Sequence, residues 1–185
     1  KNASKLKNLE KKTELICAAN AICHVPNLRD LIKGIDFLLS PNGFFIFEEP
    51  YLGSMYKKIS YDQIYDEHIY MFSVSSIKKI FNLFNFDLID VQPQITHGGS
   101  MRYVISRKNC HKIKKNVQKL LKYEKKNNID NVKGCINFKK KCEISKNKLV
   151  KKINFIKKSG KNIAGYAATS KSTTILNYCK IGNDK

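Results

Sequence analysis

Two apolar runs separated by an amphipathic segment lie in the first quarter of the chain. Residues 14–22 are mostly apolar and residues 44–47 are entirely so, as in parallel strands that are buried on both faces. Between them, apolar residues recur at helical spacing over residues 28–39, behind Asn27, which can cap the helix. The pattern predicts a strand, a helix and a second strand.

The pattern continues with a second helix and two further strands. Ser73 can cap a helix whose inner face falls on apolar residues between 77 and 84, and residues 87–91 and 101–106 are expected to be strands. The turn before the last strand contains Gly98 and Gly99, which allow positive φ and suit either a ligand-contacting loop or a tight hairpin. The succession predicts an α/β fold.

In open α/β sheets, ligands gather outside the carboxyl ends of the strands. Asn20 and His24 follow the first expected strand, and Glu48 and Glu49 end the second. The long segment 50–70 then leaves that edge, as a lid or substrate loop would. We therefore expect a functional site at this edge of the sheet.

The last third of the chain differs in composition. Lysine and asparagine dominate residues 108–159, where apolar residues keep helical spacing, so a helical connector with solvated lysine faces is expected. Residues 161–168 predict a strand and residues 172–178 a helix, the start of a second α/β domain. The expected division is therefore residues 1–107, 108–159 and 160–185.

The net charge of +20 raises the question of nucleic-acid binding. Only Arg29, Arg102 and Arg107 are arginines, and no aromatic residues alternate with the basic ones to form a stacking platform, so a nucleic-acid role is unlikely. No apolar stretch reaches the roughly 20 residues of a membrane span, and no signal core follows the charged start. A cytoplasmic location without membrane contact is the expectation.

The six cysteines do not form a metal-binding pattern. They contain no Cys-x-x-Cys pair and no zinc-like spacing with histidine, so we expect free thiols and no metal ligands in this chain. Cys17 and Cys23 are expected to pack as small hydrophobic residues.

Acids, aromatics and a histidine are densest over residues 61–73. Glu67 and His68, flanked by Tyr65 and Tyr70, offer a base that titrates near neutrality, a carboxylate to orient it and phenols to hold an oxyanion. Taken alone, the same residues also fit a polar loop with one hydrogen-bonded histidine.

Five motifs in order along the chain resemble those of the sugar C-methyltransferases. That family uses S-adenosylmethionine to methylate a carbon of a nucleotide-linked keto-deoxysugar. The motifs are Asn20-x-x-x-His24-Val25-Pro26, Gly43-x-x-x-x-Glu48, Tyr65-Asp66-Glu67-His68, Thr96-His97-Gly98-Gly99-Ser100-x-Arg102 and Tyr166-x-x-x-x-Lys171-x-x-Thr174-x-Leu176-Asn177-Tyr178. The resemblance implies the second half of a class I, Rossmann-like methyltransferase sheet, whose final strand pair includes an antiparallel strand.

The resemblance also implies roles for individual residues. His68 is expected to be the base that removes a proton beside the ketone of a dTDP-linked sugar, with Glu67 orienting it and Tyr65 and His24 around the ketone. Asn20 is expected near the cofactor. Which histidine is the base stays open. The nucleotide-sugar substrate is expected to contact His97, Gly98, Gly99, Ser100, Arg102 and Lys171.

The family carries its glycine-rich cofactor turn and a zinc-binding module upstream of the part resembled here. Lys1 is therefore expected to be an internal position, with zinc bound only in that upstream region, and the C-terminal domain is expected to be shortened. Two departures stand out: Asp66 replaces a histidine, and Ala167 replaces a glycine. The alternative expectation is a basic nucleic-acid- or protein-binding module on a degenerate methyltransferase fold.

Overall fold

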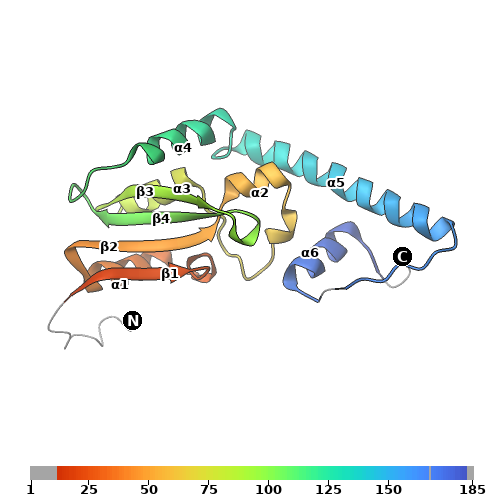
Figure 1. The fold of residues 1–185 in the computed structure, drawn as a ribbon, viewed down its shortest axis with the longest axis horizontal. Helices are drawn as coiled ribbons and strands as arrows, with labels where there is room; N and C mark the ends of the chain where they lie inside the picture. The colour runs from red at the N-terminus through yellow and green to blue at the C-terminus, as the bar shows by residue number, and fades with distance from the viewer. Residues whose placement is uncertain (1–11, 167, 183–185) are drawn as a thin grey trace.

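Four strands form one mixed sheet in the order β1-β2-β4-β3 (Figure 1). The computed structural model describes residues 12–166 and 168–182. The strands are β1 (Thr13–Ala19), β2 (Leu39–Pro50), β3 (Phe86–Gln94) and β4 (Ser100–Arg107). β1 runs parallel to β2, and β4 runs antiparallel to both of its neighbours. The α/β fold and its antiparallel last strand, both expected from the sequence, are confirmed.

Two capped helices pack against the same face of the sheet. α1 (Leu28–Leu38) begins where the side chain of Asn27 accepts a hydrogen bond from the backbone N–H of Asp30. α3 (Val74–Asn82) begins with a reciprocal capping box between Ser73 and Ser76. Both caps satisfy backbone donors that a helix start leaves free. Apolar residues of both helices join the core that contains Phe45 and Phe47.

The expectation that the first strand is buried on both faces is wrong. Leu15 is 52% exposed, while Ile16 and Ala18 pack against the core. Cys17 is exposed as well, so the expectation that it packs as a small hydrophobic residue is also wrong. Among the described residues, β1 pairs only with β2 and forms an edge of the sheet. A nearly continuous apolar run therefore does not reveal whether both of its faces are covered.

Two helices occupy the lysine-rich region. α4 (Lys115–Lys126) packs Val117, Leu120 and Leu121 against the core of the sheet, and α5 (Val132–Lys158) extends away from it (Figure 1). None of the described helices is both long enough and apolar enough to cross a bilayer. The helices expected here are present, whereas the domain boundaries remain predictions.

The strand expected at residues 161–168 is not formed by residues 161–166 and 168. A strand needs a hydrogen-bonding partner, and the described part of the chain offers none beside this segment. α6 (Ser170–Cys179), which was expected, follows with Thr169 as its cap. Ala167, which stands where the family has a glycine, and Lys1, expected to be an internal position, lie outside the described residues.

The segment between β2 and α3 contains structure that the sequence did not predict. It forms α2 (Leu52–Lys58) and a short 3-10 helix, η3 (Tyr61–Gln63). Met55 of α2 packs with Phe138 and Cys142 of α5 in a second apolar cluster. This cluster joins the expected lid to the long helix, so part of the lid is folded, whereas residues 64–71 contain no helix or strand.

Candidate active site

The carboxyl ends of β1 and β2 lie side by side, as their parallel pairing requires. The backbone N–H of Asn20 donates to the carbonyl of Glu48 at 2.9 Å, which closes this edge of the sheet. Asn20 takes a left-handed conformation, with φ of 49°. Its side-chain oxygen is buried without a partner in the described residues, so it is available to a donor from outside the chain.

Glu49 holds the turn that carries His24. Its fully buried carboxylate accepts hydrogen bonds from the backbone N–H groups of Ala21 and Ile22, at 2.9 and 2.6 Å. Burial, followed by a hydrogen bond to Glu49, raises the pKa of the Cys23 thiol to about 12. Cys23 is therefore a neutral, buried thiol, as expected. The carboxylate of Glu49 stabilises the turn through its hydrogen bonds from the backbone.

His68 has both ring nitrogens engaged within its own loop. Nδ1 lies 2.9 Å from the carbonyl of Gln63, and Nε2 lies 2.8 Å from the hydroxyl of Tyr65. A carbonyl can only accept, so Nδ1 carries the proton and donates to Gln63. In the neutral ring, Nε2 then accepts from the phenol, so its lone pair points at Tyr65.

The surroundings of His68 favour its neutral form. Burial lowers the pKa of His68, and the positive charges of His24 and Lys171 act in the same direction. The hydrogen bond from Nδ1 to the carbonyl of Gln63 and the negative charge of Glu49 oppose this, without reversing it. A neutral imidazole with a lone pair on Nε2 is the form that can accept a proton.

Glu67 contributes its backbone, not its carboxylate, to the described contacts. Its carbonyl lies 2.6 Å from Nδ1 of His24, so Nδ1 of His24 carries a proton and donates to it. The Glu67 side chain is exposed, and no hydrogen bond to His68 is found for it within the described residues. The carbonyl of Gln63 therefore orients the His68 ring, a role that was expected for the carboxylate of Glu67.

Three consecutive residues with positive φ form the turn before β4. His97, Gly98 and Gly99 have φ values of 49°, 80° and 124°. A Cβ at Gly99 would lie 2.5 Å from Oγ of Ser54, so this position requires glycine for space as well as for conformation. The ring of His97 lies 3.2 Å from the side-chain nitrogen of Asn20, which brings the turn to the end of β1.

The three remaining residues expected to contact substrate lie on β4 and α6. Arg102 pairs with Glu48 at 3.1 Å, and Glu48 also accepts from the hydroxyl of Thr96 at 2.6 Å. Ser100 is buried and its hydroxyl donates to the carbonyl of Thr96. Lys171 lies in the first turn of α6, close enough for its charge to act on His68.

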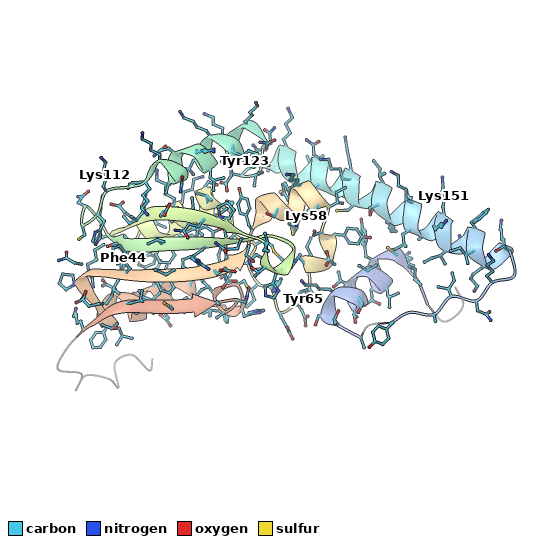
Figure 2. The ribbon with its side chains drawn as sticks, viewed as in Figure 1. Phe44, Lys58, Tyr65, Lys112, Tyr123 and Lys151 are labelled. Atoms are coloured by element: carbon cyan, nitrogen blue, oxygen red, sulfur yellow. The ribbon has the colours of Figure 1, made fainter. Side chains whose placement is uncertain are left out.

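A groove of about 640 Å³ separates residues 64–66 from α6. Tyr65 and Asp66 line one side, and Thr173, Asn177 and Tyr178 line the other. Tyr65 lies between the sheet and α6 (Figure 2). The groove leads from solvent to the loop that carries His68, so a substrate lying in it would reach Tyr65.

The fold also gathers side chains that could hold a metal ion. Cys23, His24 and His68 bring one ligand atom each to within 4.8 Å of one another. Each is already hydrogen-bonded within the protein, through Glu49, Glu67 and Gln63 respectively. Cys23 and His24 are adjacent in the sequence, and the usual spacings of zinc-binding cysteines and histidines do not include adjacent residues. The expectation of no metal ligands remains a prediction.

Sequence reasoning missed Gln63, which contacts both halves of the site. Its backbone holds His68, and its side chain donates to the carbonyl of His97 at 2.8 Å. The expected residues Asn20, His24, Tyr65, His68 and His97 are brought together at this edge of the sheet. Arg102 lies at the same edge and pairs there with Glu48.

Comparison with known proteins gives matches to both halves of the chain. A family model described as a methyltransferase domain matches residues 1–91, and one described as a C-methyltransferase C-terminal domain matches residues 95–185. The C-methyltransferase NovU of Streptomyces niveus is 26% identical over 172 residues. That similarity covers 92% of this chain and 41% of the relative, so the chain spans about two fifths of the relative's length.

Proposed function

Because this chain belongs to the C-methyltransferase family, we propose that it forms part of an enzyme that methylates a carbon beside the ketone of a dTDP-linked keto-deoxysugar, using S-adenosylmethionine. The observation that carries the proposal is the 2.8 Å contact between Tyr65 and His68, with the ring of His24 5.1 Å from that of His68. Methyl transfer to carbon requires a base and an enolate stabiliser, and this cluster offers both.

His68 is the base in this proposal. Its lone pair on Nε2 faces the hydroxyl of Tyr65, so the proton from carbon reaches it through the phenol. The C–H bond breaks, its proton passes to the Tyr65 oxygen, and the phenolic proton moves to Nε2. The electron pair left behind forms the enolate. His24, when protonated on both nitrogens, can donate from Nε2 to the enolate oxygen.

The end of β1 fits the cofactor. The buried side-chain oxygen of Asn20, which has no partner in the described residues, can accept a hydrogen bond from it. When bound, the cofactor would supply an electrophilic methyl group to the enolate carbon. Asn20 therefore orients a donor group and takes no part in proton transfer.

The remaining contacts with the substrate are assigned to the glycine turn, the start of β4 and α6. We assign the sugar to His97, Gly98, Gly99 and Ser100, and the phosphates to Arg102 and Lys171. The division into residues 1–107, 108–159 and 160–185 is proposed with it. The alternative of a nucleic-acid- or protein-binding module is not favoured, since methyltransferases match both halves of the chain.

Hydrogen exchange tests the proposal in the native protein that contains this chain. In D₂O, with the keto-sugar nucleotide and a cofactor analogue that lacks the methyl group, the hydrogen beside the ketone should exchange. His68→Gln should lower exchange and methyl transfer together by about 10²-fold or more, because the amide has no useful basicity. Glu67→Gln should cost less.

His111→Gln is the matched control, because His111 contacts the carbonyl of Asn42 away from the site. It should leave both rates unchanged. If His68→Gln exchanges at the parental rate while His24→Gln does not, His24 is the base. An unaltered protein that neither exchanges nor methylates the sugar nucleotide would rule out the proposed substrate.

A further inference from the structure

Gln63 is a buried polar residue in a loop whose other residues are exposed or half-buried. It is 5% exposed and ends η3, whereas its neighbour Ile64 is 53% exposed. Burying an amide costs free energy unless its polar groups find hydrogen-bond partners. A glutamine held inside while the adjacent isoleucine faces solvent therefore indicates that its amide is needed there.

Each end of Gln63 holds a different segment of the candidate site. Its backbone carbonyl accepts from Nδ1 of His68 at 2.9 Å, which fixes the tautomer that leaves Nε2 as acceptor. Its side-chain nitrogen donates to the carbonyl of His97 at 2.8 Å, although the two residues are 34 positions apart. One residue thus joins the loop of the base to the glycine turn.

The turn needs such support because of its backbone. His97 is not a glycine, yet it has φ of 49° and ψ of 33°, a conformation that costs of order 1 kcal/mol for an ordinary side chain. The hydrogen bond from Gln63 falls on the carbonyl of this same residue. It therefore stabilises the orientation of the peptide group between His97 and Gly98.

The side-chain oxygen of Gln63 is also buried and has no partner in the described residues. Gln63 lines a cavity of about 10 Å³ together with Ser60, Gly98 and Gly99. That volume is about what one water molecule requires. A single water there can satisfy the oxygen without disturbing the donation to His97.

We propose that Gln63 is a positioning residue that sets the glycine turn of residues 97–99 against His68, and so the place of the sugar relative to the base. This inference rests on the proposed function of the same site. Gln63 acts through His68 and the turn and does not itself exchange a proton with the substrate. A misplacement of about 1 Å between reacting groups can cost about 10²-fold in rate.

The test compares Gln63→Met, which keeps length but removes the amide, with Gln118→Met on the exposed face of α4. In the native protein, Gln63→Met should lower kcat/KM for the sugar nucleotide by about 10- to 100-fold. KM for the cofactor should change less than kcat/KM, since the backbone N–H of Asn20 donates to the carbonyl of Glu48 and not to the turn. Gln118→Met should leave both parameters unchanged.

A readout that needs no activity separates this inference from the proposed function. Amide NMR signals of Gly98 and Gly99 should move in Gln63→Met and stay in place in Gln118→Met, even if the sugar nucleotide is not the substrate. Gln63→Glu, which keeps the shape but removes the donor, replaces Gln63→Met if that variant does not fold. Unmoved glycine signals, or an active parent with unchanged kcat/KM in the Gln63 variants, would overturn the inference.

Discussion

The carboxylate of Glu124 accepts a hydrogen bond at 2.9 Å from the hydroxyl of Tyr51, 73 residues earlier in the chain. Glu124 is fully buried on α4, in the lysine-rich region that the sequence assigns to a solvated connector. Its oxygens also accept from the backbone N–H groups of Val74 and Ser75 at the start of α3. The connector is therefore anchored to the sheet domain through one buried acid.

Replacing Glu124 by Gln should destabilise the fold by about 1–3 kcal/mol. The amide has one acceptor oxygen and puts an N–H group against donors, so at least one buried backbone N–H group loses its partner. Urea unfolding measures the change. Asp130→Asn, at an exposed position, should lie within about 0.5 kcal/mol of the parent, and equal stability of the two variants would contradict the anchoring role.

Lys171→Met should raise the pKa of His68. Burial is the largest cause that lowers this pKa, and His24 and Lys171 add to it, while Gln63 and Glu49 oppose it. Removing one of the two cations leaves burial and His24 alone. An NMR titration of the His68 ring measures the shift, and Lys125→Met, on the exposed face of α4, is the control.

The lowered pKa of His68 also makes the stability of the fold depend on pH. The unfolded histidine has a pKa of about 6.5, above the folded value, so the unfolded state takes up the proton first as pH falls. The neutral ring's contribution to stability is present above about pH 6.5 and is lost as pH falls through the folded pKa. A titration with no difference between the two lysine variants would show that Lys171 does not act on His68.

Tyr65→Phe should lower hydrogen exchange beside the ketone by about 10²-fold, because in the proposed mechanism the phenol passes the proton to Nε2 of His68, 2.8 Å away. The double variant with His68→Gln should be no slower than the slower single variant, since the two residues act as one unit. Tyr70→Phe is the control, because Tyr70 donates to the carbonyl of Pro26. Additive losses in the double variant would mean that Tyr65 and His68 act independently.

Binding to nucleic acid should be weak, non-specific and steeply dependent on salt. All but three of the 35 basic residues are lysines, and they are spread over several elements, as Lys58, Lys112 and Lys151 show (Figure 2). Scattered lysines release counterions without reading bases. Fluorescence anisotropy at two salt concentrations measures this. A sequence-selective complex that survives near-physiological salt would instead favour the binding-module alternative.

The sequence determined the local elements because their signals are local. Asn27 and Ser73 cap the helices that their side chains predict, and both glycines of the last turn take the positive φ that glycine allows. Helical spacing predicted the helices α4 and α5 as well. Capping, turn formation and periodic burial depend on residues a few positions apart, which one sequence contains in full.

Only the tertiary structure decided which polar groups are buried and what they contact. The sequence gives no sign that Glu124 is inside while its lysine neighbours are outside, that Gln63 joins two loops, or that the lone pair of His68 points at Tyr65. It also predicted a first strand buried on both faces and a strand over residues 161–168, whereas β1 is an edge strand among the described residues and residues 161–166 form no strand. Each depends on a partner far along the chain, and hydrogen bonds to such partners are set by packing, not by local pattern.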